Sequence, residues 1–314
     1  MRRAKLGALE VSAIGLGCNN LGRGLDQAQT ANLVGAALDL GVNYFDTARL
    51  YGNGDSERFL GAALGGHRDQ VVIATKFGRI PRVPDAPGAD RGGIKASIRV
   101  SLQELGTDYI DLYQLHFPDG LVPIEETLEA LAELVEEGTV REIGCCNFDE
   151  ARLRGALDVS DAGGWPRFVS NQVEYSMVHR EPEQNGLAGF CERENVALLP
   201  YYPLASGLLT DKTRRGETPA GRLRMEKYSR FLSEENFDLA ERVRAFAATR
   251  ELSMAQVALG WLLSRSPVPA VTPGATRPDQ IEANVAAAEW KPSEDDLDEL
   301  HRLLADHAGP TRAT

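Results

Sequence analysis

Short apolar runs alternate with longer helical patterns along most of this chain of 314 residues. Eight of these runs are predicted to be strands, over residues 12–16, 43–46, 71–75, 110–115, 141–145, 168–173, 197–201 and 270–271. Each run is nearly continuous rather than alternating, which is typical of strands buried on both faces of a parallel sheet. Eight strand–helix units predict the α/β class and a closed TIM barrel, (β/α)8, forming a single domain over residues 1–314.

The helical patterns between these runs have recognisable ends. Helices are expected over residues 31–40, 56–64, 95–105, 124–137, 149–157, 183–194, 238–250, 254–264 and 278–288, several of them followed by the glycine that is typical of a helix C-terminus. Three segments lie outside the eight units. Residues 2–11 are expected to form an N-terminal β-hairpin at the barrel floor, 204–235 a long loop after strand seven, and 293–306 a C-terminal helix.

A doubly wound sheet is the rival architecture. Its dinucleotide fingerprint needs three glycines after the first strand, and the third is missing after Gly15 and Gly17. The net charge of −12 argues against nucleic acid or an anionic membrane as the partner, because phosphate binding requires a basic footprint. The four cysteines lack zinc or redox spacing, and no signal peptide or membrane-spanning run is found, so a cytoplasmic protein is expected.

Polar side chains follow the ends of three successive predicted strands, where the active sites of barrels lie. Asp46 ends the second strand with Tyr51 just beyond it, Lys76 ends the third, and His116 follows the fourth. Taken singly, each has an ordinary structural explanation, such as a helix cap or a surface charge. Together they predict one site that holds a carboxylate, a phenol, an ammonium group and an imidazole.

These four groups suit the reduction of a carbonyl group. A tyrosine has a pKa of about 10, and a neighbouring Lys76 ammonium is expected to lower the pKa of Tyr51, so that its hydroxyl acts as a general acid. Asp46 is expected to pair with Lys76 and keep it charged. His116 would either orient the carbonyl oxygen or share the proton, and the residues leave both roles open.

Longer motifs around these residues resemble one known family. The run Phe45-Asp46-Thr47-Ala48-Arg49-Leu50-Tyr51-Gly52-Asn53-Gly54-Asp55-Ser56-Glu57 is similar to the signature of the aldo-keto reductases, and so are segments 74–76, 115–119, 144–148, 171–175, 203–212 and 273–276. The resemblance implies a (β/α)8 barrel that reduces carbonyl compounds with NADPH and without a metal. It also implies a catalytic tetrad, formed by Asp46, Tyr51, Lys76 and His116.

The same resemblance implies a cofactor site. Asn147 and Gln172 would hold the nicotinamide carboxamide, and Tyr201 would stack on the nicotinamide ring. The remaining cofactor residues are Leu204, Gly207, Leu208 and Lys212 over the pyrophosphate, and Gly274, Thr276, Arg277, Gln280 and Asn284 beside the 2′-phosphate and adenine. Arg277 has independent support, because it precedes a predicted helix whose N-terminus favours an anion, and this favours NADPH over NADH.

The substrate pocket is predicted with less detail. A small carbonyl substrate is expected to lie against Asn20, Arg49, Phe77 and Phe117. Arg49 would either pair with an acidic substrate or point to solvent. The basic loop over residues 214–230 would clamp the cofactor, recognise an anionic substrate or form a solvated face, of which the solvated face is the default. Neither the physiological substrate nor the oligomeric state is indicated.

Two cysteines, Cys145 and Cys146, are adjacent at the end of the fifth predicted strand. Cys146 stands where the family usually has serine, and the adjacent Cys145 and Cys146 are interpreted as small buried residues rather than a redox switch. A nicotinamide-sensing regulatory subunit with little turnover is the alternative function. A metal-dependent barrel hydrolase is disfavoured, because the strand ends present no cluster of histidine and carboxylate ligands.

Overall fold

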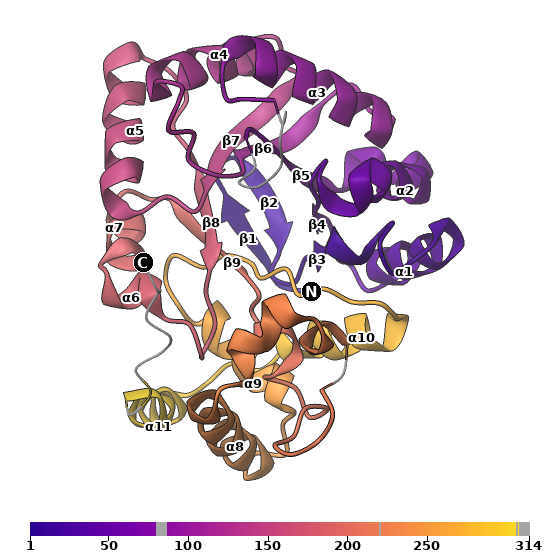
Figure 1. Cartoon of the computed structure of the whole chain (residues 1–314), viewed down its shortest axis with the longest axis vertical. Helices are drawn as coiled ribbons and strands as arrows, with labels where there is room; N and C mark the ends of the chain where they lie inside the picture. Colours follow the sequence, from indigo (N-terminus) through magenta and orange to yellow (C-terminus); the bar gives the residue numbers. More distant parts are fainter. Residues whose placement is uncertain (80–86, 220, 306, 308–314) are drawn as a thin grey trace.

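The computed structural model describes residues 1–79, 87–219, 221–305 and 307. Its main sheet contains seven parallel strands in chain order: β3 (Leu16–Gly17), β4 (Tyr44–Asp46), β5 (Val72–Phe77), β6 (Ile110–Leu115), β7 (Val140–Cys146), β8 (Ser170–Glu174) and β9 (Ala197–Tyr201). The sheet curls, and helices surround it (Figure 1). The predicted (β/α)8 class is confirmed.

The barrel closes through a few backbone hydrogen bonds rather than through an eighth regular strand. Ile14 pairs with Val271 in a parallel bridge, and the Gly15 N–H donates to the Val271 carbonyl at 2.8 Å. On the other side, the Leu198 N–H donates to the Pro267 carbonyl at 2.6 Å. The prediction of a strand over 270–271 is therefore right in position, but the segment forms only isolated bridges.

Eleven α-helices are found in the described part of the chain: α1 (Gln27–Asp39), α2 (Asp55–Leu64), α3 (Arg91–Leu105), α4 (Ile124–Glu136), α5 (Glu150–Gly163), α6 (Glu181–Gln184), α7 (Leu187–Arg193), α8 (Glu234–Ala248), α9 (Met254–Leu263), α10 (Pro278–Ala287) and α11 (Glu294–Ala305). Short 3₁₀ turns cluster after strands: η1 (Cys18–Asn20), η2 (Tyr51–Gly54), η4 (Ala205–Gly207), η5 (Gly221–Arg224) and η6 (Glu226–Leu232). Another, η3 (Gly65–Gln70), follows α2.

Local sequence signals explain most of the helix ends, but several predicted ends are wrong: α3 and α8 each begin four residues earlier than expected, and α5 ends six residues later. α1 begins four residues earlier than expected, because Asp26 and Gln29 form a reciprocal capping box. The helix expected over 183–194 is broken into α6 and α7, because Gly186 adopts a positive φ of 85° between them. The C-terminal helix is confirmed as α11, and Ser293 and Asp296 bond each other's backbone N–H groups at its start.

The predicted N-terminal hairpin closes the floor of the barrel. β1 (Arg3–Leu6) and β2 (Leu9–Ser12) pair antiparallel and lie across the end of the sheet in Figure 1. Its apolar side chains form one buried cluster with inward-facing strand residues: Leu6, Leu9 and Val11 with Tyr44, Val72, Ala74, Leu112, Leu199 and Ala270. Since this end is filled, the described residues leave the barrel open only at the opposite ends of the strands, where the polar side chains lie.

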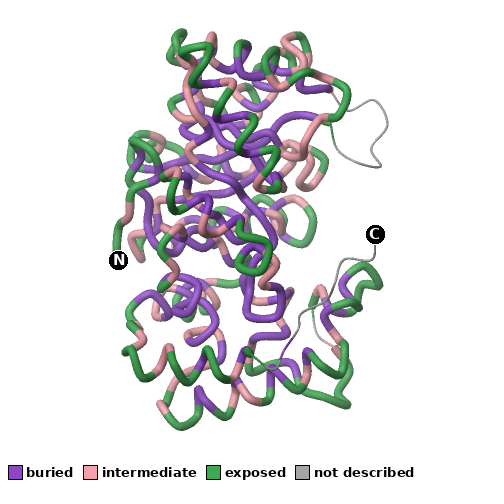
Figure 2. Tube along the Cα trace, turned by 90° about the vertical axis from the view of Figure 1, so that its left-hand side faces the viewer, coloured by how far each residue is buried: buried purple, intermediate pink, exposed green. Residues whose placement is uncertain are grey.

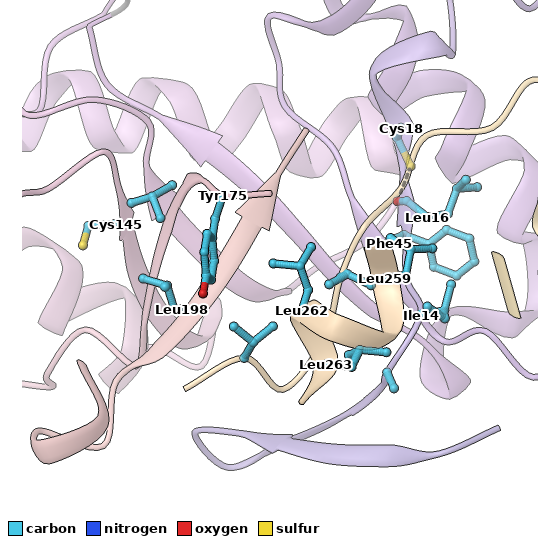
Figure 3. Packing of buried hydrophobic residues seen from close by; sticks show 14 of the residues in the cluster. Ile14, Leu16, Cys18, Phe45, Cys145, Tyr175, Leu198, Leu259, Leu262 and Leu263 are labelled. Carbon is cyan, nitrogen blue, oxygen red and sulfur yellow. Dashed lines mark hydrogen bonds between the residues drawn. The ribbon is translucent and has the colours of Figure 1, made fainter. Parts of the chain in front are cut away.

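A second and larger apolar layer fills the space between the sheet and the helices. Figure 3 shows part of it, where side chains from β3, β4, β9 and α9 pack together. Buried residues run through the middle of the molecule, while exposed residues follow the outer helices (Figure 2). None of the described helices is long and apolar enough to cross a membrane.

The alternation of β5 places the site. Ile73 and Phe77 belong to the outer layer, whereas Val72 and Ala74 belong to the inner cluster. Successive side chains of a strand point to opposite faces, so Lys76 points into the barrel and Thr75 points toward the helices. The catalytic candidate and the residue before it therefore lie on opposite sides of one wall.

Candidate active site

A buried ion pair lies at the open end of the barrel. The Lys76 Nζ donates to Asp46 Oδ1 at 2.8 Å and to the Thr47 carbonyl at 2.9 Å, and both charged side chains are almost fully buried. Burial by itself lowers the pKa of Lys76, but the charge of Asp46 and its hydrogen bond outweigh burial and raise it above its ordinary value. The ammonium group is therefore a permanent cation at neutral pH.

Tyr51 and His116 complete the predicted set. The Lys76 Nζ lies 5.3 Å from the centre of the Tyr51 ring, and the rings of Tyr51 and His116 meet edge to face with their centres 6.4 Å apart. The His116 N–H of the backbone donates to the Phe77 carbonyl at 2.9 Å, which continues the β5–β6 ladder and fixes the imidazole at the strand end. The structure thus brings all four predicted side chains together.

The protonation of Tyr51 corrects an expectation. Lys76 was expected to lower the pKa of Tyr51, but burial raises it more strongly than the charge and hydrogen bond of Lys76 lower it. The net direction is upward, so the hydroxyl carries its proton at neutral pH. A tyrosine in this state is a proton donor held beside a cation that would stabilise the phenolate left after donation.

His116 is neutral at this site. Burial, and then the nearby Lys76 cation, lower the pKa of His116 to about 3. Of the two roles left open by the sequence, this favours orienting a carbonyl oxygen through a ring N–H over donating a proton as an imidazolium. Phe117 stacks on His116 with the ring centres 4.8 Å apart, so it lies beside the tetrad as predicted.

Amide side chains form a connected group next to the ion pair. The Gln172 Nε2 donates to Asp46 Oδ1 at 3.0 Å, and Asn147 Nδ2 donates to the His116 carbonyl at 3.1 Å. The Tyr201 hydroxyl donates to Asn147 Oδ1 at 3.0 Å. Among the residues that the structure describes, Gln172 Oε1 accepts a hydrogen bond only from the weak Cys146 thiol donor, at 4.0 Å, so it keeps acceptor capacity that suits the NH2 group of a carboxamide.

The segment after β9 has an unusual backbone. Tyr202, Ala205 and Ser206 have φ values of 53°, 48° and 57°, which side chains rarely adopt, and Gly207 has 112°. Such strain concentrates at ligand sites. The hydroxyl of Ser206 and the amide oxygen of Asn19, after β3, are both buried without a hydrogen-bond partner in the described chain. These open polar groups and the strained turn fit a dinucleotide along the mouth.

Residues further along this segment support the same turn. Thr210 and Thr213 donate hydroxyl hydrogen bonds to the Gly207 carbonyl at 2.7 and 2.9 Å, and Leu208 is fully buried below. Leu204 accepts the Gly207 N–H through its carbonyl at 2.9 Å. The predicted pyrophosphate residues therefore form one braced loop.

The residues predicted to bind the 2′-phosphate and adenine lie around the start of α10 and within it. Arg277 precedes α10 and makes two hydrogen bonds of 2.9 Å to Asp279, while the charge of Lys212 also acts on Asp279. Gln280 Oε1 accepts the Thr276 N–H at 2.8 Å. Gly274 pairs with Gly17 in a parallel bridge, and Asn284 is buried within α10. The Arg277 cation thus lies at the N-terminus of α10, where Asp279 is its ion-pair partner.

One of the four predicted substrate residues is placed elsewhere. Phe77 is only 3% exposed and packs on Tyr113 with ring centres 4.5 Å apart, because the alternation of β5 turns it toward the helices. Arg49 is half-buried, and its charge acts on the buried Glu57 carboxyl and the Tyr113 hydroxyl.

Two arginines of the basic loop have different environments. Arg215 pairs with three carboxylates of α8, Glu234, Asp238 and Glu241, and belongs to a solvated face as expected by default. Arg222 donates to Asn20 Oδ1 at 2.6 Å, and Asn20 Nδ2 donates to the Ala275 carbonyl at 3.1 Å. Asn20 is therefore at the mouth as predicted, where it links η5 to the strand ends.

The cysteines agree with their structural interpretation. All four are free and buried, and burial raises the pKa of Cys146 to about 12. The Cys18 thiol donates to the Leu16 carbonyl, as Figure 3 shows. None of these thiols has the exposed, electropositive setting of a reactive cysteine.

Sequence reasoning missed several buried polar residues beside the tetrad. The rings of Tyr202 and Tyr228 meet edge to face with their centres 5.7 Å apart, but nothing in the local sequence connects residues on two different loops. Ser56 and Glu57 were expected only to open a helix. A signal was available, because Glu57 shares a helical face with Leu60 and Leu64 at spacings of three and seven residues, which predicts a buried position.

Comparison with known proteins agrees with this fold. The sequence model of the Aldo/keto reductase family matches residues 13–305. The chain is 36% identical over 302 residues to Rv2298, an uncharacterized oxidoreductase of Mycobacterium tuberculosis, covering 93% of this chain and 88% of that one. It is 31% identical over 293 residues to a probable voltage-gated potassium channel subunit beta of Oryza sativa subsp. japonica, covering 90% and 89%.

A solved structure extends the likeness to three dimensions. The holo form of aldo-keto reductase AKR11C1 from Bacillus halodurans superposes with a TM-score of 0.81 at 31% sequence identity, over 99% of both chains. The chain belongs to the aldo/keto reductase family and is an oxidoreductase.

Proposed function

We propose that this protein reduces the carbonyl group of a small aldehyde or ketone with NADPH. The observation that carries this proposal is one group of side chains at the open end of the barrel, next to the amides of Asn147 and Gln172. It consists of the buried Asp46 and Lys76 and the half-buried Tyr51 and His116. This group contains a protonated phenol beside a cation and a neutral imidazole. No nucleophile–base pair for acyl transfer is part of it.

Bound NADPH would supply the hydride that adds to the carbonyl carbon. Gln172 and Asn147 would hold its nicotinamide carboxamide, because Gln172 Oε1 keeps acceptor capacity. Tyr201, fixed by Asn147, would support the ring. The strained turn around Ser206 would hold the pyrophosphate. Arg277 with the N-terminus of α10 would bind the 2′-phosphate, which replaces Asp279 as its anionic partner.

Tyr51 would donate its proton to the carbonyl oxygen. Its raised pKa keeps the hydroxyl protonated in the resting site, and the Lys76 cation stabilises the phenolate as it forms. Asp46 prevents Lys76 from losing its own proton. The neutral His116 would donate a ring N–H to the same carbonyl oxygen, which fixes the carbonyl relative to Tyr51.

Steady-state oxidation of NADPH and NADH across a panel of aldehydes and ketones tests this proposal, with Tyr51→Phe measured alongside. We expect turnover that prefers NADPH and falls by at least about 100-fold in Tyr51→Phe, the range general acid catalysis contributes. Tight NADPH binding without turnover on any carbonyl would contradict the enzyme proposal. That result would favour the alternative, a nicotinamide-binding regulatory subunit.

A further inference from the structure

The first turn of α2 buries two polar side chains directly behind the catalytic candidates. Ser56 and Glu57 are both fully buried, although α2 begins on the surface side of the barrel wall. They follow the η2 turn that carries Tyr51. Each of them bonds to a residue adjacent in sequence to a member of the tetrad.

Ser56 connects two strand ends. Its hydroxyl donates to the Cys18 carbonyl at 2.9 Å, so the Thr47 hydroxyl, also 2.9 Å away, donates to Ser56. Thr47 follows Asp46, and its carbonyl is the second acceptor of the Lys76 ammonium at 2.9 Å. Ser56 therefore fixes the residue that supplies half of the hydrogen bonding of Lys76 to the barrel.

Glu57 acts on the Lys76 side of the Asp46–Lys76 ion pair. The Thr75 hydroxyl donates to Glu57 Oε1 at 2.5 Å, and Thr75 precedes Lys76 on β5. Because Thr75 and Lys76 point to opposite faces of the wall, a bond that holds Thr75 from outside also fixes the direction in which Lys76 leaves the backbone inside. The contact joins α2 to β5 through a directional hydrogen bond.

Burying a carboxyl group at position 57 is energetically unfavourable. Burial raises the pKa of Glu57, and the hydroxyls of Thr75 and Ser101 and the charge of Arg49 only partly oppose it. An apolar residue of similar size would bury without this penalty. A short directional bond to Thr75 is what the carboxyl adds, because an apolar contact has no preferred direction.

We propose that Ser56 and Glu57 are positioning residues that fix the Lys76 ammonium between Asp46, Thr47 and Tyr51 by holding Thr47 and Thr75. Neither touches a reacting atom. The catalytic consequence rests on the proposed carbonyl reduction, whereas the effect on Lys76 is independent of any substrate. When Thr75 is released, Lys76 moves away from Tyr51 and stabilises its phenolate less.

Thr75→Val tests the proposal with little change of shape. We expect the kcat of carbonyl reduction to fall about tenfold with KM within twofold, because the loss concerns the transition state. In the reverse direction, alcohol oxidation needs the Tyr51 phenolate. Weaker stabilisation of the Tyr51 phenolate by the Lys76 cation raises the pKa of Tyr51. The acid limb of the pH–rate profile for oxidation should therefore move upward by at least about 0.5 pH unit.

Three further variants separate positioning from general stability. Glu57→Gln keeps an acceptor for Thr75 and should behave as wild type, whereas Glu57→Ala should behave as Thr75→Val. Ser56→Ala should move the pH profile in the same direction. Ser12→Ala is the matched control, because the Ser12 hydroxyl is equally buried and donates to the Ile14 carbonyl at 2.7 Å, at the filled end of the barrel. Its pH profile should not move.

The Lys76 ammonium can also be observed without substrate. The chain has only six lysines, so its slowly exchanging 15N–1H signal can be assigned with Lys76→Met. We expect this signal in wild type, Glu57→Gln and Ser12→Ala, and its loss or broadening in Thr75→Val. An unchanged signal in Thr75→Val would overturn the proposal even if the enzyme were inactive. Loss of the signal with no carbonyl turnover in wild type would overturn only the proposed function.

Discussion

The substitution Asp46→Asn tests whether the buried ion pair is organised as described. It removes the carboxylate and leaves a Lys76 side chain that is 1% exposed without a counter-charge. Breaking a buried pair in this way costs about 3–5 kcal/mol of unfolding free energy. Folded proteins of this kind are stable by about 5–15 kcal/mol, so we expect a large but measurable loss at pH 7.

The loss should depend on pH in a defined direction. In wild type the pKa of Lys76 is raised, so its stabilising contribution is complete below the ordinary lysine pKa and does not change between pH 7 and 9. In Asp46→Asn the charge of Asp46 no longer opposes burial, so we expect burial to lower the pKa of Lys76 in the folded state. The unfolded chain then binds more protons, so the stability of the variant rises with pH by up to about 1.4 kcal/mol per unit.

Urea unfolding of both proteins at pH 7, 8 and 9 measures this difference. The deficit of Asp46→Asn should shrink as the pH rises, and the double variant Asp46→Asn/Lys76→Met should regain most of the lost stability. A deficit below about 1 kcal/mol that is the same at pH 7 and pH 9 would refute the buried, mutually dependent pair.

Three other predictions follow from the same site. As the pH falls from 6.5 to 4, the unfolding free energy of His116→Asn, measured in urea, should fall less than that of wild type. In wild type the folded pKa of His116 is about 3, so over this range the unfolded chain gains a proton at His116 and the folded chain does not. Arg277→Met should raise the KM for NADPH several-fold and leave the KM for NADH within twofold; equal changes for both cofactors would count against a 2′-phosphate site. Native protein should resist alkylation by iodoacetamide at pH 8, followed by mass spectrometry, because all four cysteines are buried; modification of Cys146 without urea would contradict this.

The parts of the site at strand ends could be predicted from sequence. Asp46, Lys76 and His116 each follow a short apolar run, and parallel strands in a barrel end at one face, so the topology itself brings these residues together. The hairpin was predictable for a similar reason, because its apolar residues had no other surface to cover. The prediction about Phe77 failed because it ignored the two-residue period of β5, which requires Lys76 and Phe77 to point in opposite directions.

Other features depend on contacts between distant residues. The pKa of Tyr51 is raised because burial outweighs Lys76, and the depth of burial cannot be read from the spacing of Tyr51 and Lys76. The link from Arg222 to Asn20 joins residues 202 positions apart. Glu57 was recognisable as buried from its helical face, but its bond to Thr75 depends on how α2 packs on β5.

The most direct test of the proposed function follows the hydride. Wild-type protein is given NADPH carrying deuterium at the transferred position and an aldehyde from the panel, and the alcohol product is analysed by mass spectrometry. We predict one deuterium on the carbinol carbon, and no product above background from Tyr51→Phe, which should still bind NADPH. NADPH consumption without deuterium in the alcohol, or undiminished turnover by Tyr51→Phe, would contradict carbonyl reduction with Tyr51 as the proton donor.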